Sequence, residues 1–212
     1  MSAAEHADRT PDTVVFDLGG VLIEWDPRLL YRTLLPEDEV EAFLVEVEFA
    51  EWNALQDAGR PFAEAVEVHA KRFPHRRELL AAYHERFPET MVGPIEGTVD
   101  ILRELAQRGT RLLSLTNWSA ETFRHARERF DFLEEFESIL VSGEVKLAKP
   151  DPRIFALLVE TYGLRPAETV YIDDSARNVA AGTTAGLHSL LFTSPEQLRA
   201  DLSRLGVLAG AP

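Results

Sequence analysis

Short apolar runs alternate with longer helical segments along most of this chain of 212 residues. The runs are rich in β-branched and aromatic residues, and they occur at 13–16, 111–115, 138–141, 169–172 and 188–192. Helical patterns precede the last four runs, at 98–107, 120–130, 151–162 and 176–184. This alternation predicts βαβ crossovers, and therefore an α/β fold in which helices cover both faces of a doubly wound parallel sheet.

A long helical insertion interrupts this alternation after the first run. Residues 24–93 show helical periodicity and no convincing strand pattern. A loop of that length without secondary structure is uncommon in a compact domain. We therefore expect a helical cap at 24–93 and a core formed by 13–23 and 94–212. Residues 1–12 lack the basic and apolar regions of a signal peptide and are expected to form a flexible tail.

The composition disfavours several classes of protein. The chain has 22 basic and 36 acidic residues and a formal charge of −14, which would repel nucleic acid and anionic membranes. It has no cysteine, which is consistent with a reducing compartment. No apolar run approaches the about 18 residues of a membrane-spanning helix. We expect a cytoplasmic protein, a monomer or homodimer, that acts on a small molecule.

Polar residues with catalytic chemistry follow four of the predicted strands. They are Asp17 after the first run, Thr116 and Asn117 after the second, Lys149 in the loop after the third, and Asp173 and Asp174 after the fourth. The carboxyl ends of parallel strands meet at one edge of the sheet, and ligands bind there where the strand order changes. The sequence therefore predicts that these side chains share one site.

This set of residue types is suited to hydrolysis of a phosphate ester. Three carboxylates repel one another unless a cation lies between them, and Mg²⁺ prefers carboxylate oxygens, water and phosphate as ligands. Lys149 can neutralise both a nucleophile and a transferred phosphoryl group, and Thr116 can contact phosphate oxygens. Because carboxylates act as nucleophiles through aspartyl-phosphates, we expect a covalent intermediate on Asp17.

Four segments of the chain, in order, resemble the four motifs of the haloacid dehalogenase-like hydrolase superfamily: FDLGGVL, LTNWS, KPDPRIF and YIDDSARN. Within this superfamily the chain is similar to phosphatases with a C1-type helical cap and a DLGxV first motif. These include α-D-glucose-1-phosphate phosphatases and the N-terminal phosphatase domains of epoxide hydrolases. The resemblance implies a Rossmannoid core, Mg²⁺ as cofactor, and small phosphate monoesters, with sugar phosphates among them, as substrates.

The resemblance also implies a role for each matching residue. Asp17 would be the nucleophile and Lys149 the neutralising charge. The expected substrate contacts are Thr116, Asn117, Gly19, Gly20 and Trp25. The expected metal ligands are Asp17, the backbone carbonyl of Gly19, Asp173 and Asp174, with Asn178 orienting the acidic loop.

One position departs from the pattern of related phosphatases. They usually have a second aspartate two residues after the nucleophile, which serves as general acid and then as general base, and here that position is Gly19. Losing this group would remove a contribution of roughly 10²- to 10⁴-fold to the rate. The residues considered as replacements are Glu24, Asp26, His69, His75 and His84.

Two other functions remain open from the sequence. A 2-haloacid dehalogenase would use Asp17 to displace halide, which needs no general acid, but it would have no use for a metal site at Asp173 and Asp174. A weakly active binding or regulatory module would also tolerate Gly19, although packing alone does not require charged residues at four strand ends.

Overall fold

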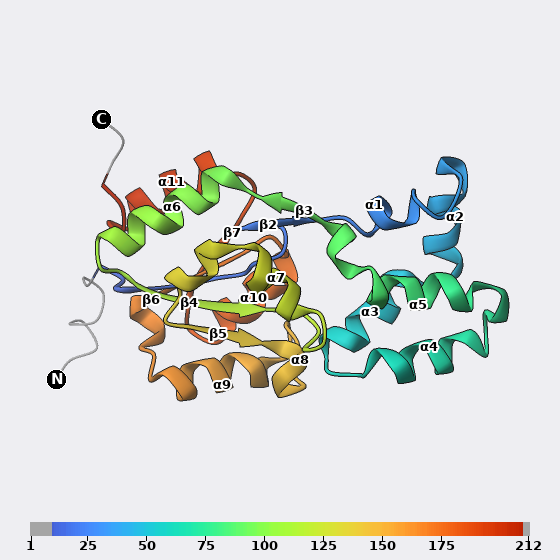
Figure 1. The fold of residues 1–212 in the computed structure, drawn as a ribbon. Helices are drawn as coiled ribbons and strands as arrows, with labels where there is room; N and C mark the ends of the chain where they lie inside the picture. The colour runs from blue at the N-terminus through green and yellow to red at the C-terminus, as the bar shows by residue number, and fades with distance from the viewer. Residues whose placement is uncertain (1–9, 210–212) are drawn as a thin grey trace.

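The computed structural model describes residues 10–209, in which helices enclose a five-stranded parallel sheet (Figure 1). The strands are β1 (Thr13–Phe16), β4 (Arg111–Thr116), β5 (Ser138–Val141), β6 (Thr169–Asp173) and β7 (His188–Leu191). Their spatial order is β5-β4-β1-β6-β7, so the chain builds outward on one side of β1 and then on the other. The predicted doubly wound sheet is confirmed, and its switch point lies at β1.

Helices bury both faces of this sheet. They are α6 (Glu96–Gln107), α7 (Phe123–Arg129), α8 (Ser142–Val145), α9 (Pro152–Tyr162), α10 (Ala176–Thr184) and α11 (Pro195–Arg204), with the 3₁₀ helices η4 (Asp131–Glu135) and η5 (Pro166–Glu168). Val14 and Phe16 belong to a hydrophobic cluster with side chains of α6 and α11, whereas Val15 belongs to a second cluster with those of α9. Because both faces are buried, β1 is apolar throughout.

A second, helical unit lies beside the sheet, and we call residues 26–90 the cap (Figure 1). Its helices are α1 (Pro27–Tyr31), α2 (Glu37–Glu46), α3 (Phe49–Asp57), α4 (Phe62–Ala70) and α5 (Arg77–Glu85), with the 3₁₀ helices η2 (Pro74–Arg76) and η3 (Phe87–Thr90). Aromatic rings form its centre. The ring of Phe49 lies 5.0–5.9 Å, between centroids, from those of Tyr31, Trp52 and Tyr83. Such contacts give the cap a hydrophobic core of its own.

The expectation that 24–93 contains no strand is wrong. β2 (Ile23–Trp25) and β3 (Met91–Pro94) pair as a two-stranded antiparallel ribbon, through which the chain enters and leaves the cap. These strands were hard to recognise because they are three and four residues long, and β3 contains Gly93 and Pro94, which are depleted in strands. Residues 1–9 of the predicted tail lie outside the described residues, while the Asp12 N–H donates to the carbonyl of Glu168 (3.1 Å).

Cap and core also touch away from the ribbon. The Ser142 hydroxyl, at the start of α8, donates to the backbone carbonyl of Asp57 (2.5 Å), where α3 ends. The N–H of Phe62 donates to the Glu121 carboxylate of the core (2.9 Å). The Arg129 guanidinium of the core donates to the carbonyl of Pro88 in η3 (3.4 Å). These contacts hold the cap over the carboxyl edge of the sheet.

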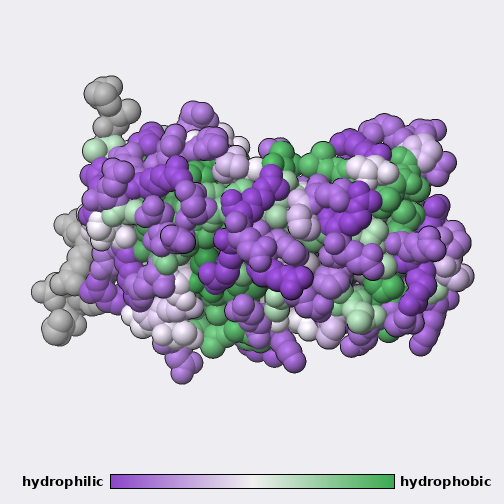
Figure 2. All heavy atoms as spheres, viewed as in Figure 1, coloured by the Kyte–Doolittle hydropathy of each residue, from purple (hydrophilic) through white to green (hydrophobic). Residues whose placement is uncertain are grey.

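The surface is mostly polar. In Figure 2 hydrophilic side chains cover most of the visible face, with smaller hydrophobic areas between them. Trp25 and Val92 of the β2–β3 ribbon are among the exposed large apolar side chains, at 36% and 41%. None of the helices described here is both long and apolar enough to span a bilayer.

Candidate active site

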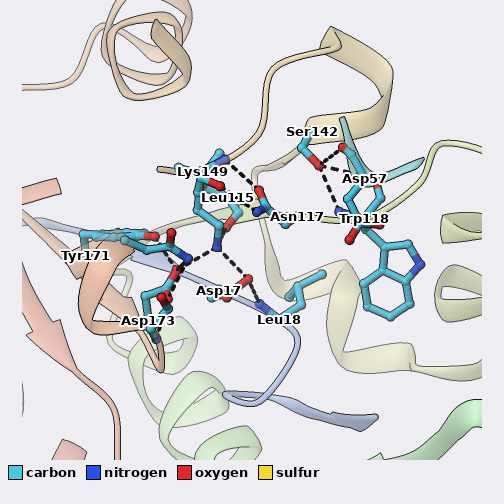
Figure 3. A network of polar contacts seen from close by, with 12 residues as sticks. Asp17, Leu18, Asp57, Leu115, Asn117, Trp118, Ser142, Lys149, Tyr171 and Asp173 are labelled. Carbon is cyan, nitrogen blue, oxygen red and sulfur yellow. Dashed lines mark hydrogen bonds and ion pairs between the residues drawn. The ribbon is translucent and has the colours of Figure 1, made fainter. Parts of the chain in front are cut away.

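The strand ends bring together the charged residues that the motifs predicted. Asp17 follows β1 directly, Asp173 is the last residue of β6, and Lys149 lies between α8 and α9. Lys149 Nζ lies 2.9 Å from Asp17 Oδ1 and 2.7 Å from Asp173 Oδ2 (Figure 3). Because β1 and β6 are neighbours at the switch point, residues 156 positions apart in sequence meet across one ammonium group.

Lys149 is held as a cation in the interior. Its side chain is fully buried, and Nζ also donates to the carbonyl of Leu115 (2.9 Å). Burial alone would lower the pKa of Lys149, but the charges of Asp17 and Asp173 outweigh burial and raise it. Its backbone is fixed as well, since Asn117 Nδ2 donates to the Lys149 carbonyl (2.9 Å) and Asn117 Oδ1 accepts from the Lys149 N–H (2.8 Å).

The Asn117 side chain contacts the backbone of the lysine loop, and its expected contact with phosphate stays a prediction. Both polar atoms of its amide are engaged by the backbone of Lys149. The geometry makes Asn117 a positioning residue for the lysine loop.

Asp173 is surrounded by donors on both oxygens. Oδ1 accepts from the Ser175 N–H (2.8 Å) and from Asn178 Nδ2 (3.0 Å), which is where the sequence placed Asn178. Oδ2 accepts from Lys149 and from the hydroxyl of Tyr171. Burial would raise the pKa of Asp173, but Lys149 and these donors lower it, so the carboxylate stays ionised.

Tyr171 was missed from the sequence, although a signal exists. In a strand, residues two apart point to the same face, so Tyr171 in β6 had to lie beside Asp173. Its hydroxyl helps to keep the Asp173 carboxylate in place for Lys149.

Asp17 is a buried carboxylate that remains open to a ligand. Oδ1 accepts from the Leu18 N–H (2.7 Å) and from Lys149, and the residue is 7% exposed. Burial raises its pKa to about 7, against the opposing charge of Lys149 and with a further rise from Asp173. One ammonium is thus too little positive charge to stabilise this group fully as an anion.

The carboxylates meet the requirements of a divalent cation. Ligand oxygens of Asp17, Asp173 and Asp174 all lie within 4.8 Å of one another. Asp173 already has both oxygens engaged, so Asp17 and Asp174 are the better placed to hold a metal. Hard oxygen ligands on a rigid edge, with excess negative charge, suit Mg²⁺.

The two glycines after the nucleophile differ in their surroundings. Gly20 has φ +73°, and a Cβ there would lie 2.2 Å from Asp174 Oδ2, so only glycine lets Asp174 approach. A Cβ at Gly19 would meet no atom within 4 Å. The backbone therefore leaves room for the side chain that Gly19 lacks.

Thr116 offers an unused hydroxyl at the end of β4. Its Oγ1 is buried, and no hydrogen-bond partner is found for it among the described residues. The hydroxyls of Ser114 and Thr98 are in the same state, but Thr116 is the one at the strand end. A buried polar atom without a partner is costly, so this hydroxyl is suited to a ligand oxygen.

A cavity of about 290 Å³ lies above these residues, between core and cap. Its walls are formed by Asp17, Gly19, Gly20, Trp25, Asn53, Asp57, Phe62, Tyr83, Phe87, Asn117, Trp118, Ser119, Thr122 and Asp174. Gly19, Gly20 and Trp25, which were expected to contact the substrate, thus line this cavity. The five residues considered as replacement acids are absent from these walls: His69, for example, is bound to the carbonyl of Val47 inside the cap.

The cavity instead contains a carboxyl that sequence reasoning missed. Asp57, at the end of α3, accepts from Asn53 Nδ2 (3.1 Å) and from the N–H of Ser119. Burial raises its pKa to about 7, while the Ser119 N–H and the charge of Lys149 oppose that rise. Nothing in the sequence singles out Asp57, because its position depends on how the cap packs on the core.

Comparisons with known proteins agree with this site. The family model for haloacid dehalogenase-like hydrolases matches residues 11–186. The pyrophosphatase PpaX of Halalkalibacterium halodurans is 25% identical, over 83% of this chain and 80% of its own length. The sesquiterpene phosphatase astK of Aspergillus oryzae is 23% identical, over 84% of this chain and 88% of its own.

A solved structure shares the fold. The magnesium complex of the HAD family enzyme BT-2542 from Bacteroides thetaiotaomicron has a TM-score of 0.69 at 22% identity, covering 88% of this chain and 95% of its own. The four motif segments meet at one edge of the sheet, and the family model spans all of the core strands except β7. This chain therefore belongs to the haloacid dehalogenase-like hydrolases.

Proposed function

We propose that this protein is a Mg²⁺-dependent phosphatase of small phosphate monoesters that acts through an aspartyl-phosphate on Asp17. The observation that carries the proposal is the contact of Lys149 with Asp17 and Asp173, at 2.9 and 2.7 Å. A buried ammonium beside a buried carboxylate is suited to draw an anionic phosphoryl group toward a nucleophile. The relatives named as phosphatases support the same reaction class. We propose the cytoplasm as its compartment.

The reaction has two half-reactions. In the first, a carboxylate oxygen of Asp17 bonds to phosphorus while the bond from phosphorus to the ester oxygen breaks, and the leaving alkoxide takes a proton from water. In the second, water bonds to phosphorus and the bond to Asp17 breaks, which releases inorganic phosphate. The Thr116 hydroxyl is suited to hold a phosphoryl oxygen, and Lys149 supplies positive charge beside Asp17 throughout.

The metal would be held by Asp17 and Asp174, with Asp173 keeping Lys149 and the acidic loop in position. When bound, Mg²⁺ supplies positive charge that offsets the carboxylates and the phosphoryl oxygens. Gly20 leaves the space that Asp174 needs for this task.

The first test is phosphate release from p-nitrophenyl phosphate with Mg²⁺ and with excess EDTA. EDTA should abolish turnover, and Asp17→Asn should lower kcat by at least about 10³-fold. Asp131→Asn is a matched control, because Asp131 is an exposed carboxylate paired with Arg103 away from the site. Turnover that persists in Asp17→Asn would exclude Asp17 as the nucleophile.

An isotope experiment separates this proposal from dehalogenation. In H₂¹⁸O, attack of water on phosphorus puts the label into phosphate and leaves Asp17 unlabelled. Hydrolysis of a carbon ester on Asp17 would instead put the label into its carboxylate. Halide release from a 2-haloacid with label in Asp17, and no phosphatase activity, would favour the dehalogenase alternative. Ligand binding without turnover of any substrate would favour a binding module.

A further inference from the structure

We infer that the substrates are monoesters of small uncharged alcohols with an aromatic or aliphatic body, and that esters with a second anionic group are rejected. The inference rests on the proposed function and concerns the same cavity. It follows from the chemistry of the walls around the position of the leaving group.

Aromatic rings form most of the walls outside the phosphate subsite. They come from β2, from the cap and from the loop after β4: Trp25, Phe62, Tyr83, Phe87 and Trp118. The rings support one another, with centroids 5.6 Å apart for Tyr83 and Phe87 and 5.9 Å apart for Phe87 and Trp118. The indole N–H of Trp118 is already bound to the Thr122 hydroxyl (3.2 Å). The cavity therefore offers mainly apolar contact to a bound organic group.

The walls hold three carboxyl groups and no lysine, arginine or histidine. Nearby cations have other partners. Lys149 is taken up by Asp17 and Asp173, and His84 stacks on Phe62 with its Nε2 3.3 Å from Glu121. A second carboxylate or phosphate on the substrate would find no counter-ion and would face Asp57. Leaving a charge unpaired in a confined site is strongly unfavourable.

The volume of the cavity suits a compact leaving group. About 290 Å³ is at the lower end of the range for pockets that enclose a drug-sized ligand, and the phosphoryl group takes part of it. A benzyl, phenyl or short branched alkyl group fits this space. The structure thus favours a compact apolar monoester over a phosphorylated carboxylic acid.

The test is the binding of two phosphonates, which cannot be hydrolysed, to the Mg²⁺-loaded protein at pH 8. Benzylphosphonate carries an uncharged ring, and phosphonoacetate carries a carboxylate in its place. We expect calorimetry to give a Kd for benzylphosphonate at least about 10²-fold lower. Equal or tighter binding of phosphonoacetate overturns the inference. Because no turnover is needed, this outcome is independent of whether the protein is a phosphatase.

A variant isolates the charge of the wall. Asp57→Asn keeps the size of the side chain and removes its charge. The ratio of the Kd for phosphonoacetate to the Kd for benzylphosphonate should therefore fall about tenfold. Asp131→Asn removes one negative charge at an exposed position away from the cavity and should leave the ratio of the two Kd values within about twofold of wild type. If Asp57→Asn is folded by circular dichroism and the preference does not narrow, the carboxyl at 57 plays no part in rejecting anions and that part of the inference is wrong.

Discussion

The contrast between Gly19 and Gly20 leads to a prediction of gained activity. Related phosphatases have an acid–base aspartate at the position of Gly19, and a side chain there would enter open space. We predict that Gly19→Asp folds and raises kcat for esters of poor leaving groups, such as benzyl phosphate. Gly20→Ala should be impaired instead, because its φ is +73° and its Cβ would lie 2.2 Å from Asp174 Oδ2.

The magnitude follows from two opposing terms. A positioned general acid contributes roughly 10²- to 10⁴-fold. A new carboxylate would be repelled by Asp17 and by Asp174, by about 2 kcal/mol each at an assumed separation of about 8 Å and an effective dielectric of about 20. The charge of bound Mg²⁺ would offset about half of this total, which leaves somewhat more than one factor of ten. The expected gain for benzyl phosphate is therefore about tenfold to a hundredfold. For p-nitrophenyl phosphate it should be smaller, since that leaving group needs little protonation.

The assay compares kcat for the two esters in four proteins: wild type, Gly19→Asp, Gly19→Asn and Gly19→Ala. The asparagine variant matches the aspartate in size and cannot transfer the proton. A gain confined to Gly19→Asp, and larger for benzyl phosphate, supports the reasoning. If Gly19→Asn gains as much, or if folded Gly19→Asp gains nothing on benzyl phosphate, the missing acid is not what limits this enzyme.

Three further predictions concern buried groups. Lys149→Met should lower kcat by about 10²- to 10³-fold or more, measured as phosphate release, because Asp17 and Asp173 lose their shared ammonium. Tyr171→Phe should lower kcat about tenfold by removing one donor to Asp173, with little change in the far-ultraviolet circular dichroism. The Tm of Asp57→Asn minus the Tm of wild type should increase as the pH rises from 5 to 8. The Asp57 pKa rises from 3.8 to about 7 on folding, so wild-type stability falls as pH rises through that interval; a constant difference in Tm would contradict this.

Local patterns were sufficient to predict the core of the fold. β1, β4, β5 and β6 are largely buried and β7 lies at the edge of the sheet, but each contains a short apolar run, and these predictions are confirmed. The ribbon β2–β3 was missed because Gly93 and Pro94 carry no strand pattern, and its pairing joins residues about 70 positions apart. Its formation depends on the cap that it connects.

The residues of the site also divide into those that local patterns predict and those that depend on tertiary packing. Asp17, Lys149, Asp173 and Asp174 are brought together by strand order alone, which is why motif spacing located them. Tyr171 was within reach of a two-residue period. Asp57 could not be predicted as a site residue. Its contact with Ser119 requires the packing of α3 against the loop after β4, and no short-range pattern encodes that packing.

The β2–β3 ribbon has a consequence for how this molecule can diversify. The chain enters the cap through Ile23–Trp25 and leaves through Met91–Pro94, and these two segments are hydrogen-bonded neighbours. Because the two ends of the cap are neighbours, another helical unit with the same distance between its ends could replace the cap without moving any strand of the sheet. The carboxylates and the ammonium would stay in place, while Asp57 and the cap aromatics Phe62, Tyr83 and Phe87 would be exchanged together. The reaction and a large part of the selectivity are thus encoded in separable stretches of this chain.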